Sequence, residues 1–212
     1  MKKILLLFAF TTLISCDIQY DGEKRLVFQT IVLDGNGEPL PNSHVEITTQ
    51  SEWASDLISK GKTDDSGKLT LIFPSPDGDV DINLKFYHDY DSYMEKEVLE
   101  INKTDFENYK FIYPNTYLLK GDEVATLTMI YNQTSPNTIL KKISIEGIYH
   151  LPYELYNYEE ENYYNQPYEF LVKMNQNFQL KYTVKNMTTN VETNYSVQLQ
   201  FGNDTISYTL NY

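Results

Sequence analysis

Cys16 is the single cysteine of this 212-residue chain, and its thiol could serve three kinds of chemistry. It could form a disulfide, act as a nucleophile or carry a lipid. A disulfide within the chain is excluded because it needs a second cysteine. The residues before Cys16 are a basic start, Met1-Lys2-Lys3, and an apolar stretch from Ile4 to Ile14, a pattern typical of a secretory signal peptide. A membrane-spanning helix needs about 20 apolar residues, so this stretch is too short to be one.

Leu13-Ile14-Ser15-Cys16 resembles the lipobox of bacterial lipoproteins, in which a leucine, a variable residue and a small residue precede the cysteine. The resemblance implies cleavage between Ser15 and Cys16, a diacylglyceryl group on the Cys16 sulfur, and acylation of the new amino group. Each buried CH₂ contributes about 0.8 kcal/mol, so two or more lipid chains give stable attachment. Residues 1–15 are then a signal peptide and residues 16–23 a flexible, lipidated leash. The alternative is a signal peptide that is cleaved elsewhere and merely contains a cysteine.

A second candidate site is the tyrosine-rich stretch from Tyr149 to Tyr168, which also holds several glutamates. Tyrosine rings offer flat apolar faces and hydroxyls that form hydrogen bonds, so the stretch could be a platform for a glycan or a peptide. The platform residues would be Tyr156, Tyr158, Tyr163 and Tyr164. The alternative, which we favour, is a hairpin whose tyrosines pair across strands while the acidic residues keep an edge soluble.

The remaining polar residues form no pattern typical of a metal or catalytic site. The three histidines, His44, His88 and His150, lack ligand spacing, and no zinc, redox or nucleophile motif occurs. Asp77, Asp79 and Asp81 are spaced like the start of a calcium loop, but the glycine and the final glutamate of such a loop are missing. We therefore predict no catalytic residue, no metal and no cofactor. A hydrolase without a recognisable motif stays open as an alternative.

The composition favours a folded, strand-rich and acidic protein. Lys and Arg total 17 against 30 Asp and Glu, which gives a net charge of −13. Such a surface repels phosphate backbones, so nucleic acid is excluded as a predicted partner. The content of 41% hydrophobic residues is ordinary for globular proteins. The 19 tyrosines and 10 phenylalanines favour strands over helices.

The elements that must position these residues are predicted to be short strands joined by turns. From Leu26 onward, apolar and polar residues alternate in segment after segment, and "DGNGEPLPN" and "TDDSG" are turn sequences. Val32-x-Asp34-x-x-Gly37-x-Pro39-Leu40, followed by Thr63-Asp64-Asp65-x-Gly67, resembles the carboxypeptidase regulatory-like domain. That resemblance implies a transthyretin-like β-sandwich at residues 24–120, without catalytic residues.

A second series of strands follows this region. Phe178, Leu180, Tyr182 and Val184 alternate with polar residues, as do the last two strand-like segments of the chain. We therefore expect a second β-sandwich at residues 121–212. The predicted fold class is all-β: two consecutive antiparallel β-sandwiches, Ig-like or transthyretin-like, after a signal peptide and a short linker.

Together these patterns predict a non-catalytic lipoprotein of the bacterial cell envelope that binds or scaffolds at a membrane surface. Its lipid anchor makes the membrane one partner, and a glycan or an envelope protein is the candidate second partner. The outer membrane is the expected location. The alternatives are an accessory glycan-binding lipoprotein that uses the Tyr149–Tyr168 stretch, and the hydrolase mentioned above.

Overall fold

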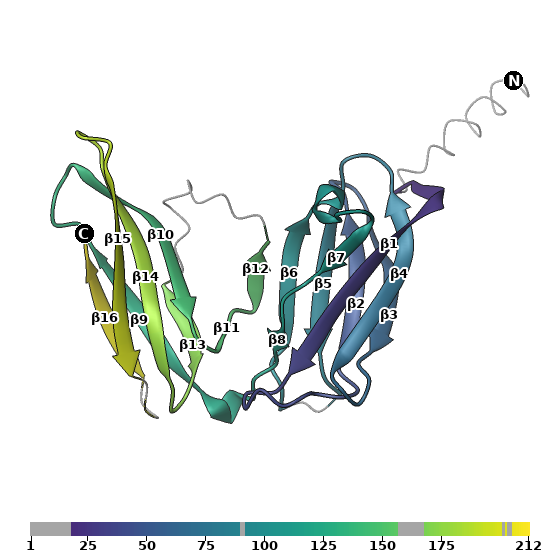
Figure 1. Cartoon of the computed structure of the whole chain (residues 1–212), viewed down its shortest axis with the longest axis horizontal. Coiled ribbons are helices and arrows are strands. Elements are labelled where there is room, and N and C mark those ends of the chain that lie inside the picture. The colour runs from purple at the N-terminus through teal and green to yellow at the C-terminus, as the bar shows by residue number, and fades with distance from the viewer. Residues whose placement is uncertain (1–17, 90–91, 157–167, 201, 203–204) are drawn as a thin grey trace, which may run out of the picture.

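The computed structural model describes residues 18–89, 92–156, 168–200, 202 and 205–212. In these ranges the chain is built of strands, with two short 3-10 helices, and forms two sandwiches that stand side by side (Figure 1). The prediction of an all-β chain with two consecutive sandwiches is confirmed. No helix in the described ranges combines the length and the apolar character needed to span a membrane.

The first sandwich consists of one sheet in the order β4-β1-β7, with β8 also pairing β1, and a five-stranded sheet in the order β12-β6-β5-β2-β3. Most neighbours are antiparallel, but β1 pairs in parallel with β7 and β8. The strands are β1 (Tyr20–Leu33), β2 (His44–Gln50), β3 (Ser55–Lys62), β4 (Lys68–Pro76), β5 (Asp81–Tyr87), β6 (Lys96–Ile101), β7 (Lys110–Ile112), β8 (Thr116–Tyr117) and β12 (Tyr153–Leu155). The 3-10 helix η1 (Lys103–Asp105) lies between β6 and β7.

The core of the first sandwich comes from the alternation seen in the sequence. Leu26, Phe28 and Val32 of β1 point inward and are almost fully buried, because successive side chains of a strand point to opposite faces. They pack with apolar residues from the facing sheet, among them Ile47 and Phe86. The hydrophobic effect of this shared interior therefore holds the two sheets together.

Two turns of the first sandwich have the same local geometry. The amide of Gly37 donates to the carbonyl of Asp34, and the amide of Gly67 donates to the carbonyl of Asp64. Both glycines have positive φ, 81° and 71°. The Asp34 carboxylate also accepts backbone N–H groups of its own turn, as Asp64 does. Asp side chains satisfy turn amides in this way, and glycine adopts positive φ without steric cost.

The second sandwich has one sheet in the order β10-β14-β15 and another in the order β11-β13-β9-β16. Its strands are β9 (Val124–Asn132), β10 (Thr138–Glu146), β11 (Tyr149–His150), β13 (Glu169–Lys173), β14 (Asn177–Asn186), β15 (Glu192–Gln200) and β16 (Ile206–Asn211), after the 3-10 helix η2 (Gly121–Glu123). β16 pairs in parallel with β9. Its separate core includes Leu127, Phe178, Leu180 and Leu210.

Strand β12 lies between β11 and β13 in the sequence but belongs to the first sandwich (Figure 1). It pairs in parallel with β6, Tyr153 opposite Glu97 and Leu155 opposite Leu99. The amide of Glu97 donates to the carbonyl of Pro152 at 2.8 Å, and Lys96 and Glu154 form an ion pair at 2.7 Å. A division of the chain at residues 120 and 121 therefore leaves one strand of the first sandwich in the second part.

The chain is already folded within residues 16–23, which were predicted to be a flexible leash. Ile18 is only 8% exposed, and β1 already begins at Tyr20. The Tyr20 hydroxyl lies 2.7 Å from Thr49 Oγ1 and donates to Asp56 at 2.9 Å. The polar composition that suggested a leash instead belongs to the exposed start of a long strand, which distant partners hold in place.

Candidate binding site

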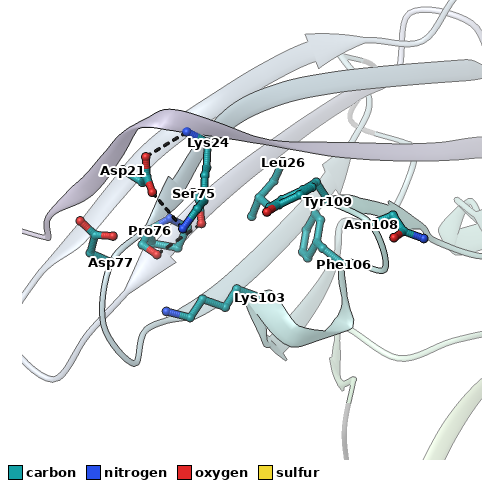
Figure 2. Close-up of a pocket in the computed structure, with 10 residues that line it drawn as sticks. All are labelled: Asp21, Lys24, Leu26, Ser75, Pro76, Asp77, Lys103, Phe106, Asn108 and Tyr109. Carbon is teal, nitrogen blue, oxygen red and sulfur yellow. Dashed lines mark hydrogen bonds and ion pairs between the residues drawn. The ribbon is translucent and has the colours of Figure 1, made fainter.

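A groove of about 430 Å³ lies at the end of the first sandwich where the described chain begins (Figure 2). The start of β1 forms one side, the end of β4 a second, and the connection from β6 to β7 a third. Its lining includes Asp21, Lys24 and Leu26 from β1, Asp77 after β4, and Lys103 and Tyr109 from the connection. Both cationic and anionic side chains therefore line the same groove.

Asp21 is the most strongly bonded charged group of the groove. Its Oδ1 accepts the backbone N–H groups of Glu23 and Lys24 at 2.8 and 2.9 Å, and its Oδ2 lies 3.2 Å from Lys24 Nζ (Figure 2). The two backbone hydrogen bonds, Lys24 first, lower the pKa of Asp21. The hydrogen bond to Asp21 raises the pKa of Lys24. Both groups are thus held in their charged forms, because each interaction favours the ionised state.

The floor of the groove is apolar and its rim is aromatic. Leu26 and Phe106 are buried, and Phe106 packs edge-on against Phe73 with ring centroids 5.8 Å apart. Tyr109 is 56% exposed and has a φ of 66°. Lys103 Nζ donates to the carbonyl of Gly78 at 2.7 Å, which ties the connection to the turn after β4. The groove can therefore hold a small polar group against an apolar floor.

The chemistry that the groove offers is that of its charged and apolar side chains. Within the described ranges, no group of three His, Cys, Asp or Glu side chains is placed to hold a metal ion. The side chains of Asp21, Lys24 and Lys103 bond to each other or to the backbone. What the arrangement offers is recognition of a polar ligand, because cationic and anionic side chains lie beside apolar ones in the same groove.

Most of the residues predicted as sites lie outside the described ranges. These residues are Cys16, Tyr158, Tyr163 and Tyr164. Tyr156 is described, at 36% exposed, and its ring packs edge-on against Phe111 with centroids 5.0 Å apart. Burial raises the pKa of Tyr156. Tyr156 therefore contributes to packing of the first sandwich.

The described part of the tyrosine-rich stretch does not form the hairpin that we favoured. β11 pairs with β13, whereas β12 pairs with β6, so the two short strands pair with different sandwiches instead of each other. Tyr149 packs edge-on against Phe170 of the second sandwich. The physical reason is competition: the free edge of β6 offers backbone partners that a tight hairpin would otherwise supply.

Two further residues, Trp53 and His150, are functional candidates that no pattern in the sequence indicates. Trp53, the single tryptophan, is 78% exposed in the turn between β2 and β3. His150 is 2% exposed, and its Nδ1 has no hydrogen-bond partner among the described residues. Burial, and secondarily Lys96, lower the pKa of His150 from 6.5 to about 4. A buried histidine shows in the sequence only as one polar residue among apolar ones.

No protein-family model and no curated protein sequence matches the chain. Among solved structures, it is similar to a 9R-lipoxygenase from Cyanothece, at 15% identity over 54% of this chain and 20% of that one, with a TM-score of 0.32. It is similar to catechol 1,2-dioxygenase from an Acinetobacter species, at 11% identity over 48% and 55%, with a TM-score of 0.33.

The chain is also similar to the shaft pilin SpaA of Lactobacillus rhamnosus GG, at 7% identity over 88% of this chain and 96% of the pilin, with a TM-score of 0.35. The chain thus spans a fifth of the lipoxygenase and about half of the dioxygenase. Similarities of this size assign the chain to no family and carry no activity over to it.

Proposed function

We propose that the chain is a non-catalytic binding or scaffolding protein of the bacterial cell envelope, anchored to the outer membrane through a lipid on Cys16. The observation that carries this proposal is where the fold begins. Ile18 is buried two residues after Cys16, and β1 starts at Tyr20. Cleavage downstream of Tyr20 would remove its hydrogen bonds to Thr49 and Asp56. The fold is therefore compatible with cleavage between Ser15 and Cys16, as with any cleavage before Ile18.

The binding role is supported by the groove at the same end of the sandwich. Its floor is apolar, and its charged side chains, Asp21 and Lys24, are fixed by mutual contacts. Ligand sites combine apolar walls with a few placed polar groups in this way. A small polar group of an envelope component is the ligand class that such a lining fits.

Mass spectrometry of the mature protein from bacterial membranes tests the anchor. We expect an N-terminus at Cys16 that carries the diacylglyceryl and acyl masses. The Cys16→Ser variant should lack both and leave the membrane fraction, because a hydroxyl is a far poorer nucleophile than a thiolate. An unmodified Cys16, or an N-terminus elsewhere, would contradict the proposal and leave an ordinary secreted protein.

Glycan binding is the second candidate, supported by exposed rings beside the stretch 157–167. Tyr153 is 66% exposed and Tyr168 is 69% exposed, so the two ends of this stretch present aromatic faces. Replacing Tyr158, Tyr163 and Tyr164 together by serine should abolish binding on a glycan array. The matched control is Tyr156→Ser, which should instead lower stability because that ring packs on Phe111. Turnover of an arrayed glycan would favour the hydrolase alternative.

A further inference from the structure

We infer that the end of the first sandwich that carries Trp53 and Tyr109 rests in the headgroup region of a zwitterionic lipid surface. The inference builds on the proposed anchor and adds the orientation of the molecule and the residues that contact the lipid. Four parts of the chain make up this end: the start of β1, the turn from β2 to β3, the turn after β4, and the connection from β6 to β7.

The first step is the short reach between the anchor and the folded body. Two residues span at most about 7 Å when fully extended. The headgroup layer on each side of a bilayer is about 5–7 Å thick. Ile18 is buried, and the carbonyl of Gln19 accepts the amide of Asp77 at 2.8 Å. A lipid on Cys16 therefore keeps Ile18 within about one headgroup-layer thickness of the anchored residue.

The second step places Trp53 at this end. Tyr20, at the start of β1, bonds through its hydroxyl to Thr49 and Asp56, which face each other across β2 and β3. The turn that holds Trp53 follows directly and is closed by a hydrogen bond from Ser51 N to Ala54 O at 2.8 Å. The only tryptophan of the chain thus lies near the start of β1 and is 78% exposed.

The third step is the second aromatic ring at this end. Tyr109 is 56% exposed at the rim of the groove (Figure 2). Its carbonyl accepts the amide of Val27 at 2.8 Å, which fixes the loop to β1. Tryptophan and tyrosine are enriched at membrane interfaces because their rings are apolar while their N–H and O–H groups remain hydrated. Two exposed rings of this kind on fixed loops are the side chains expected at a membrane interface.

The charges at this end select the type of lipid. The basic side chains are Lys24, Arg25 and Lys103, and the acidic ones nearby include Asp21, Glu23, Glu52, Asp77 and Asp79. Among these residues the acidic side chains outnumber the basic ones, so an anionic surface would be repelled. A zwitterionic headgroup carries both an ammonium and a phosphate, and the groove offers carboxylates and ammonium groups together.

Tryptophan fluorescence of the lipidated protein in phosphatidylethanolamine and phosphatidylcholine vesicles tests the inference, because Trp53 is the only emitter of its kind. We expect a shift of its emission to shorter wavelength on reconstitution, with quenching by lipids brominated close to the headgroup. The unlipidated Cys16→Ser protein mixed with the same vesicles should show neither effect.

Two matched variants separate this end from the rest of the molecule, both in a Trp53→Phe background. Tyr109→Trp should give the same shift and quenching. Glu38→Trp should give neither, because Glu38 lies past the far end of β1, roughly 30 Å away when the nine residues of β4 that pair along β1 are counted at about 3.3 Å per residue. If mass spectrometry confirms the lipid and Trp53 is not quenched, the orientation is wrong while the anchor stands. If no lipid is present, both proposals fail.

Discussion

At the scale of single residues, Gly67 occupies a turn in which a Cβ atom would not fit. A Cβ at this position would lie 2.4 Å from the carbonyl oxygen of Val32, and φ is +71°. Gly37 also has positive φ, at +81°, but a Cβ there meets no atom within 4 Å. The two glycines therefore share a conformational requirement, and only Gly67 adds a steric one.

The alanine variants of these two glycines separate the two requirements. Gly37→Ala should cost about 1–2 kcal/mol, the strain of a left-handed conformation for a residue with a Cβ. Gly67→Ala should cost clearly more, because the backbone of β1 must also move away. Urea unfolding of both variants measures the difference. Equal losses of stability would show that the contact with Val32 relaxes freely.

His150 links stability to pH. Its folded pKa of about 4 lies below its ordinary value of 6.5, so the unfolded chain binds the proton first as pH falls. The stability contributed by the neutral, buried ring is present above about pH 6.5 and is lost as pH falls towards 4, by up to roughly 3 kcal/mol. Lys96, whose charge also lowers the pKa of His150, forms an ion pair with Glu154 between the neighbouring strands β6 and β12.

The variant His150→Leu should flatten the dependence of unfolding free energy on pH between 6.5 and 4. The leucine keeps the buried volume and removes a nitrogen that has no described partner, so stability at neutral pH should change little. Thermal unfolding across this pH range checks the prediction. An unchanged pH profile would mean that carboxylates, and not His150, govern the loss of stability at acidic pH.

At the scale of elements, local chemistry decides which features were predictable. The Asp34 and Asp64 turns could be predicted because the aspartate and the glycine that form each turn are neighbours in sequence. The pairing of β12 with β6 could not, because a three-residue strand has no periodic signal and its partner comes far earlier in the chain. The position of Trp53 near the chain start likewise depends on the distant bonds of Tyr20.

The contribution of strand β12 can be tested with a fragment of residues 17–121, which lacks this strand. The fragment should unfold cooperatively, because it keeps the first core except for the contacts of β12 and Tyr156. It should melt at a lower temperature than the same sandwich in the full chain, because β6 loses its backbone partner. Circular dichroism against temperature measures both. A fragment as stable as the intact sandwich would show that β12 contributes nothing.

At the scale of the whole molecule, the net charge of −13 sets a background repulsion. Surface ion pairs join β3 to the segment after β5, through Lys62 and Asp89, and β10 to β15, through Lys141 and Glu192. Exposed pairs of this kind contribute little stability. Salt screens both the overall repulsion and the surface ion pairs. At physiological salt, exposed charges farther apart than about 8 Å are largely screened from each other. The sign of the salt dependence therefore reports which of the two is larger.

We expect the melting temperature to rise when sodium chloride increases from 10 to 150 mM, because repulsion among the excess acidic groups is relieved. Differential scanning calorimetry at constant pH gives the measurement. Potassium chloride at equal ionic strength is the control, since screening does not depend on the identity of a monovalent cation. A falling melting temperature would mean that the local ion pairs outweigh the overall repulsion.

Because β12 comes much later in the chain than its partner β6, the two strands can pair only late in synthesis or folding. When residues 1–120 have emerged from the ribosome, β6 still lacks its neighbour β12, and its edge stays open until residue 155 follows. An open edge can pair with another chain, so this interval is when misassembly threatens. Pulse-labelled hydrogen exchange during refolding should therefore protect the amide of Glu97, which donates to Pro152, later than the amides between β1 and β4.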